Sequence, residues 1–214
     1  QKKDNVKGDT KEQKITDNTE SVNAVAIIGI VDPISANQMN LYYNSIYVGG
    51  SQTGSALNSY CYARQNTSNA TLRNNLFYNA RTGSGFHYAI GSGSAPTFNS
   101  NYNAFVTADS SYVGEWATVN QNIDQWRTIS GGDANSWYAK TTQVPAAQLF
   151  TSLSTGNLVI NTSNAPAWLV KGKGIAVNTV NTDYSGNPRS TSIAGGTTCI
   201  GASEFTAVPP SNPV

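Results

Sequence analysis

The chain has 214 residues, a formal net charge of +1 at pH 7 and only 12% charged residues. This balance gives no electrostatic basis for binding nucleic acid or an anionic membrane, because both need clustered Lys and Arg. No apolar run approaches the roughly 20 residues that a membrane-spanning helix needs, so membrane insertion is not expected either.

Small polar residues dominate the composition, with 25 Asn, 23 Ser, 22 Thr and 19 Gly. Disordered chains are usually poor in aromatic residues, whereas this chain carries 11 Tyr, 6 Phe and 4 Trp. Aromatic residues next to β-branched residues favour strands, and Asn, Gly and Ser favour turns. The composition therefore predicts an all-β protein with many short strands and many turns.

Charge is concentrated at the start of the chain, where residues 1–20 hold ten of the 25 Lys, Arg, Asp and Glu residues. We interpret this segment as a solvated arm or as a cap over the first exposed strand edge. It lacks the apolar core of a signal peptide, so we expect a mature product or a fragment of a longer protein. Residues 21–207 are expected to form the packed structure, and residues 208–214 a Pro-rich linker.

A repeat of about 30 residues begins after the charged segment. Asn44, Asn74 and Asn103 each start an Asn-x-apolar pattern, at spacings of 30 and 29 residues. A second strand-like element falls between these copies at 59–63 and again at 87–91. Equal spacing is typical of a solenoid, whereas the hairpins of a sandwich vary in length. We therefore expect a right-handed parallel β-helix with rungs of about 30 residues.

Equivalent side chains stack on one another in such a helix, because each rung lies about 4.8 Å above the last. We expect Ile46, Leu76 and Phe105 to form one inward apolar stack. The three Asn residues of the repeat are expected to form a ladder of amides, in which each buried amide is satisfied by its neighbours.

The repeat fades after about Ser111. Residues 118–137 are expected to form an excursion that contains a short amphipathic helix at 122–127. Strands are then expected to resume at 157–160 and at 175–177.

Two cysteines, Cys61 and Cys199, lie 138 positions apart and do not have the spacing of metal ligands. We interpret them as two buried thiols. A long-range disulfide is the alternative.

The strings Asn-Leu-Tyr-Tyr-Asn-Ser-Ile-Tyr-Val at 40–48 and Leu-Arg-Asn-Asn-Leu-Phe-Tyr-Asn at 72–79 resemble the rungs of right-handed parallel β-helix proteins. Within that group the chain is similar to C-terminal β-helix regions of large secreted or surface proteins of Bacteroidetes-type bacteria. In that family an Asp-x-x-Gly-x-x-Arg turn followed by Ile-Gly-Ala-x-Glu marks the end of the helix, as at 183–189 and 200–204 here. The resemblance covers roughly residues 22–205 and implies an extracellular or cell-surface location. It does not imply an activity, because the fold hosts lyases, hydrolases, adhesins and inert stalks.

Asp183, Asn187 and Glu204 could bind Ca²⁺ through oxygen ligands. The preferred interpretation is that residues 186–188 form a turn and that Arg189 pairs with Asp183 or Glu204 to close the last rung. We therefore expect no cofactor and no metal, with Ca²⁺ at these three residues as the alternative.

His87 is the only histidine and so the default general base. It lies between Phe86 and Tyr88 in a predicted strand, and no acid or nucleophile can be placed beside it. We interpret it as a strand residue with a satisfied imidazole. The acids beyond residue 20 share no rung position in the repeat, so no residue is predicted to be catalytic; they are Asp32, Asp109, Glu115, Asp124, Asp133, Asp183 and Glu204.

Tyrosines are dense in the predicted rungs. Tyr47 and Phe77 neighbour inward positions and are expected to face outward, with Tyr78 beside them. An outward aromatic stripe is a platform for sugar rings, because it combines flat apolar faces with hydroxyl groups. The alternative is a patch covered by loops or by a neighbouring domain.

These observations favour an extracellular scaffold or adhesion-type module that contacts carbohydrate and other domains of a longer parent protein, without catalysing a reaction. The alternative is the C-terminal part of a secreted polysaccharide lyase or glycoside hydrolase whose catalytic rungs lie elsewhere. An all-β sandwich lectin is a third class.

Overall fold

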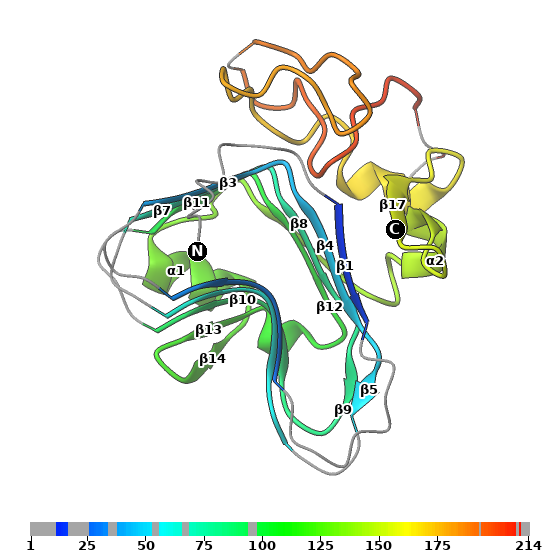
Figure 1. Cartoon of the computed structure of the whole chain (residues 1–214). Coiled ribbons are helices and arrows are strands. Elements are labelled where there is room, and N and C mark those ends of the chain that lie inside the picture. The colour runs from blue at the N-terminus through cyan, green and yellow to red at the C-terminus, as the bar shows by residue number, and fades with distance from the viewer. Residues whose placement is uncertain are drawn as a thin grey trace, which may run out of the picture.

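The computed structural model describes residues 12–16, 26–33, 38–52, 56–65, 69–93, 98–192, 194–208 and 210. Its main feature is a stack of parallel strands through which the chain winds repeatedly (Figure 1). This arrangement confirms the expected β-solenoid and excludes a sandwich. Most of the N-terminal segment 1–20 and of the linker 208–214 lies outside the described residues.

Three sheets form the walls of the solenoid. Sheet A contains β1 (Glu12–Thr16), β4 (Ser45–Gly49), β8 (Leu76–Asn79), β12 (Ala104–Thr107) and β15 (Trp137–Lys140). Sheet B contains β2 (Ile27–Asp32), β6 (Ser59–Arg64), β10 (His87–Ser92), β13 (Gly114–Trp116) and β14 (Val119–Gln121). Sheet C contains β3 (Met39–Tyr42), β7 (Ala70–Arg73) and β11 (Phe98–Asn101). A short pair, β5 (Ser51–Gln52) and β9 (Thr82–Gly83), lies between sheets A and B along the chain.

The rungs repeat at the expected period, since β4, β8 and β12 begin at residues 45, 76 and 104. Equivalent strands of successive rungs pair in parallel, whereas β13 and β14 form an antiparallel hairpin at one end of sheet B. On the other side of the stack, β1 pairs in parallel with β4, so residues 12–16 form a strand of sheet A.

The amide ladder exists, but its middle member is Asn75 and not Asn74. Asn75 Oδ1 accepts from the Asn44 backbone N–H and side-chain amide, both at 3.0 Å. Asn103 Oδ1 accepts the same two bonds from Asn75, at 2.8 and 3.0 Å. The ladder ends on buried Asp133 and Ser136, which bond to the Asn103 side chain and backbone N–H.

Asn74 instead occupies the sharp corner between sheets C and A. Its φ angle is +59°, and Tyr43 and Tyr102 at the same place in the neighbouring rungs have φ angles of +57° and +56°. Asn tolerates this left-handed conformation better than most residues, so Asn can occupy the corner as well as the ladder. The sequence pattern therefore does not distinguish which residue of the Asn74-Asn75 pair takes the corner and which joins the ladder. The register expected for the middle rung was therefore wrong by one residue.

That slip also changes the inward stack, because a shift of one residue turns each side chain to the other face of the sheet. The stack consists of Ile46, Phe77 and Phe105, which are paired in register and fully buried. The rings of Phe77 and Phe105 lie 5.9 Å apart with planes 12° apart. Leu76, which was expected in this stack, faces outward from sheet A.

The long strands of sheet B, such as β10, bend sharply (Figure 1). At the bend, the N–H groups of Ala89 and Ile90 both donate to the Val113 carbonyl, as occurs at a β-bulge. Successive residues, such as Cys61 and Tyr62, therefore both pack in the interior core. Because of the bend, the outer surface of sheet B consists of two parts that meet at an angle.

The expected helix closes the end of the interior core. Helix α1 (Ile123–Ser130) starts with a capping box between Asn122 and Gln125 and ends at Gly131, whose φ of +66° suits glycine. Trp126 is fully buried, with its ring 5.6 Å from that of Phe98. The helix therefore covers the core where sheet C has no further strand.

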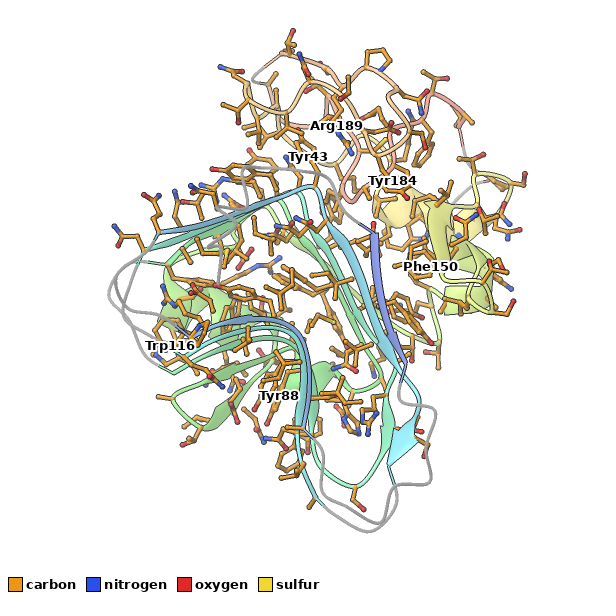
Figure 2. All side chains as sticks on the ribbon, viewed as in Figure 1. Tyr43, Tyr88, Trp116, Phe150, Tyr184 and Arg189 are labelled. Carbon is orange, nitrogen blue, oxygen red and sulfur yellow. The ribbon has the colours of Figure 1, made fainter. Side chains whose placement is uncertain are left out.

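A second core lies between the outer face of sheet A and the segment that follows β15. This segment contains α2 (Ala146–Leu149), β16 (Phe150–Ser152), β17 (Asn157–Ile160) and the 3₁₀ helix η2 (Ala165–Leu169). Leu149, Phe150 and Ile160 belong there to one buried cluster with Leu76 and Tyr78 of sheet A. Figure 2 shows Phe150 beside sheet A.

The strand expected at 157–160 is confirmed as β17, but the strand expected at 175–177 does not form. The Asn74 side chain accounts for this difference. Its amide donates to the Ile175 carbonyl at 2.7 Å and its Oδ1 accepts from the Ile175 N–H at 2.9 Å. Cys61 and Cys199 are both free and buried, as the first of the two interpretations predicted.

Candidate functional site

The three residues predicted to form an exposed aromatic stripe do not form one. Phe77 faces the interior and is fully buried, so its expected outward orientation is wrong. Tyr78 faces outward from sheet A but is only 1% exposed, and its hydroxyl donates to the Val144 carbonyl at 2.6 Å. Tyr47 is half-buried, with its ring 6.0 Å from that of Phe150. Tyr47 and Tyr78 instead fit the alternative interpretation, in which the aromatic patch is covered by another part of the protein.

Asp183 and Asn187 form the predicted turn. Asp183 Oδ1 accepts from the backbone N–H groups of Ser185 and Asn187, and its Oδ2 accepts from the Asn187 side chain and the Glu204 N–H. Burial raises the pKa of Asp183, but these four bonds outweigh burial and hold the pKa below its ordinary value of 3.8.

Glu204 joins the predicted ion pair with Arg189, at 3.0 Å. Its carboxylate also accepts from the Thr198 hydroxyl and the Cys199 N–H. The Arg189 guanidinium lies over the Tyr43 ring, 4.0 Å from its centroid, and therefore holds the turn against a corner of the solenoid (Figure 2). The described residues contain no group of three or more His, Cys, Asp or Glu side chains that could hold a metal ion. The Asp183 carboxylate accepts four hydrogen bonds, and the Glu204 carboxylate accepts from Arg189, Thr198 and Cys199.

His87 lies at the start of β10, as expected. Its Nδ1 lies 3.0 Å from the hydroxyl of Ser59, which is fully buried, while its Nε2 has no hydrogen-bond partner among the described residues. The interpretation of a satisfied imidazole is therefore right for one nitrogen only. Burial, followed by the charge of Arg81, lowers the pKa of His87. The Ser59 hydroxyl is inaccessible to a substrate, so this pair does not resemble a nucleophile and its base.

A different aromatic cluster lies on the outer face of sheet B. Tyr60 and Tyr88 are paired in register, and their rings stack with centroids 5.2 Å apart and planes 19° apart. Figure 2 shows Tyr88 on the side of sheet B that faces away from sheets A and C. A Cβ atom at Gly91 would lie 2.8 Å from the Tyr60 ring, so glycine is required for this ring to lie over β10.

Phe86 and Tyr112 lie over Tyr88 and expose aromatic surface to solvent. Their ring centroids are 4.6 Å apart, and each lies about 6 Å from the Tyr88 centroid, at 6.2 and 6.1 Å. Tyr88 is fully buried beneath them, whereas Phe86 is 41% exposed and Tyr112 is half-buried. We call Tyr60, Phe86, Tyr88 and Tyr112 the sheet B aromatic surface.

Polar groups border these rings. The Tyr60 hydroxyl donates to Glu115 at 2.8 Å, and the Tyr88 hydroxyl donates to Asn120 Oδ1 at 2.5 Å. The Asn58 side chain joins the two parts of the surface, because its oxygen accepts from the Phe86 N–H at 3.0 Å and its nitrogen lies 3.5 Å from Glu115. The surface therefore combines exposed rings with a carboxylate and amides.

Tyr60 and Tyr88 remain neutral at physiological pH. Burial is the main cause that raises the pKa of both Tyr60 and Tyr88 well above 10, and the nearby Glu115 charge adds to it. Both hydroxyls therefore donate hydrogen bonds to their acceptors, which fixes the two rings and the Glu115 carboxylate in place.

A surface hollow of about 380 Å³ also lies beside α1, lined by Gln121, Asp124, Gln125, Thr128 and Ile129. Its lining contains no aromatic ring, and its one carboxylate, Asp124, pairs with Arg127 at 3.1 Å. It offers fewer specific contacts than the sheet B aromatic surface does.

The fold defines the chain as a parallel β-solenoid protein, with its most distinctive exposed surface on sheet B. The chain matches no protein-family model, no curated protein and no solved structure, so these comparisons assign it to no family. Among the described residues, no helix is both long and apolar enough to cross a membrane.

Proposed function

We propose that the chain is an extracellular scaffold or adhesion-type module that contacts glycans through the sheet B aromatic surface and does not catalyse a reaction. The observation that carries the proposal is the pair of accessible rings, Phe86 and Tyr112, which lie over Tyr88 of sheet B, with Glu115 and Asn58 beside this cluster. Aromatic faces stack on the apolar faces of sugar rings, and carboxylates and amides bond to sugar hydroxyls. This surface replaces the one first expected at Tyr47, Phe77 and Tyr78.

The chemistry of the surface supports binding in preference to cleavage. Glycoside hydrolases use two carboxylates at a defined separation, whereas Glu115 is the one carboxylate among the described residues of this surface. His87 starts the same strand as Tyr88 but bonds to buried Ser59. The extracellular location and the relation to surface proteins of Bacteroidetes-type bacteria rest on the rung and turn motifs, and they belong to the proposal.

The end strands of the three sheets favour an enzymatic alternative. The strands β1, β2 and β3 each stand at the end of their sheet in the described structure. Further rungs of a longer polysaccharide lyase or glycoside hydrolase would stack there and could carry catalytic groups. A carboxylate cluster on such rungs would favour the enzyme.

A glycan array followed by calorimetry tests the proposal. Phe86→Ala and Tyr112→Ala should each weaken saccharide binding by about fivefold to tenfold, because one stacked ring is worth about 1 kcal/mol or slightly more. Tyr184→Ala is the matched control, since Tyr184 is 58% exposed on the C-terminal segment and lies outside this surface. Binding of neutral saccharides should be nearly independent of salt. If Tyr184→Ala weakens binding as much as Phe86→Ala does, the assignment of binding to the sheet B aromatic surface is wrong. Turnover of a polysaccharide by the purified chain would overturn the proposal that the chain is not catalytic.

A further inference from the structure

Glu115 is a half-buried acid beside the rings of the sheet B aromatic surface. Its carboxylate accepts from Tyr60 at 2.8 Å and lies 3.5 Å from the Asn58 amide, and no described Lys or Arg forms an ion pair with it. By contrast, Asp124 pairs with Arg127 and Glu204 pairs with Arg189. Glu115 is only half-buried, so its remaining acceptor positions can meet a ligand.

The neighbouring rings attract a positively charged ligand, as the Glu115 carboxylate does. The face of an aromatic ring is electronegative and attracts ammonium groups within about 6 Å, and several rings together form the usual binding site for organic cations. Tyr60 lies next to Glu115, and the stacked ring of Tyr88 links it to exposed Phe86 and half-buried Tyr112. Ring faces and a carboxylate thus meet on one surface.

We propose that the sheet B aromatic surface recognises amino sugars, with Glu115 binding the protonated amine and the exposed rings stacking on the sugar. This inference rests on the proposed glycan-binding function and names its ligand class. An amine alone would use the carboxylate but would leave the aromatic faces of Phe86 and Tyr112 without a partner. A uronic acid would bring a second negative charge beside Glu115 and would be repelled.

Calorimetry on the full chain with four ligands of equal length tests the inference. The ligands are a glucosamine oligomer, its fully N-acetylated form, a uronic acid oligomer and oligolysine. The glucosamine oligomer should bind about tenfold more tightly than the N-acetylated form, because acetylation removes the charge that Glu115 and the rings attract. The uronic acid oligomer should bind most weakly among the saccharides, and oligolysine should bind more weakly than the glucosamine oligomer.

Glu115→Gln keeps the shape of the side chain and its bond from Tyr60 but removes the charge. It should reduce the preference for the amine to about twofold or less while binding of the N-acetylated oligomer stays unchanged. Asp124→Asn is the matched control, because it removes one negative charge from an exposed side chain on α1 and should keep the preference.

The outcomes separate this inference from the proposed function. If the N-acetylated oligomer binds as tightly as glucosamine, the inference falls and glycan binding stands. If no saccharide binds, both fall. If oligolysine binds as tightly as the glucosamine oligomer, the surface recognises amines without the sugar, and the amino-sugar assignment is wrong. The ligand comparison uses the unaltered chain, so it decides the question even if Glu115→Gln does not fold.

Discussion

At the scale of single residues, the amide ladder shows how this polar chain can build a dry interior. Asn44, Asn75 and Asn103 are at most 5% exposed, and each satisfies the amide of a neighbouring rung. Burying an amide without partners is costly, so the ladder is stabilising only if every rung contributes its member. Asp133 completes the network by accepting from the last amide of the ladder.

Replacement of Asn75 should therefore be severe. Asn75→Leu keeps a similar volume but leaves the Asn44 N–H without its acceptor and removes the side-chain bond to Asn103 Oδ1, although the backbone N–H of residue 75 can still donate to that oxygen. We expect the free energy of unfolding to fall by about 3 kcal/mol or more. Asn178→Leu, at an exposed position, should change it by about 0.5 kcal/mol or less. Urea denaturation measures both, and equal midpoints would contradict the role assigned to the ladder.

Asp183 should make stability depend on pH in the acid range. Because its pKa is lower in the folded chain than the ordinary 3.8, the folded state favours the ionised carboxylate. The stabilisation is complete above the unfolded pKa and is lost as the pH falls through the folded pKa. Asp183→Asn should lower stability at neutral pH and flatten its decline below about pH 4. Thermal unfolding of both chains between pH 2 and 7 measures this, and parallel curves would contradict it.

At the scale of elements, the sequence predicted helix α1, which depends on nearby residues, better than the rung register, which depends on distant ones. The amphipathic pattern of residues 122–127 indicated a helix in the sequence, and the capping box between Asn122 and Gln125 that starts α1 is likewise a local interaction. The rung register, by contrast, depended on which residue of the Asn74-Asn75 pair takes the corner, and a single sequence carries no local signal for that choice. The absent strand at 175–177 likewise depends on a partner, Asn74, that is 101 residues away from Ile175.

The sheet B aromatic surface was missed for a similar reason. Tyr60 and Tyr88 are 28 positions apart at the same place in the repeat, so their stacking could have been inferred. Tyr112 and Glu115 lie where the repeat fades, and the bend of sheet B sets which residues face outward. Their position beside the tyrosines follows from the tertiary structure alone.

Helix α1 should be essential for closing the interior core. Trp126 fills the end of this core, and its Nε1 donates to Asp133 at 2.8 Å. We expect Trp126→Ala to lower the free energy of unfolding by about 3–5 kcal/mol, and Trp126→Phe by less because an aromatic ring remains. Ile129→Ala, on the same helix but 49% exposed, should have little effect. Denaturation of the three variants tests this, and a small effect of Trp126→Ala would show that α1 does not close the core.

At the scale of the whole molecule, the solenoid has two different ends and two cores. Helix α1 closes one end of the interior core, while the segment after β15 covers the outer face of sheet A and contacts the corner residues Tyr43 and Asn74. The segment after β15 thus lies over sheet A, whereas on the outer face of sheet B the exposed ring of Phe86 and the half-buried ring of Tyr112 lie over Tyr88.

The opposite end of sheet A depends on β1, within the charged N-terminal segment. Because β1 pairs with all five residues of β4, its removal would expose the backbone N–H and C=O groups of β4 along that edge. An exposed strand edge invites pairing with other chains. Deletion of residues 1–20 should therefore lower the melting temperature by about 5 °C or more and increase aggregation. Deletion of residues 1–11 keeps β1 and is the matched control. If both deletions leave melting temperature and solubility unchanged, β1 does not protect the edge of β4.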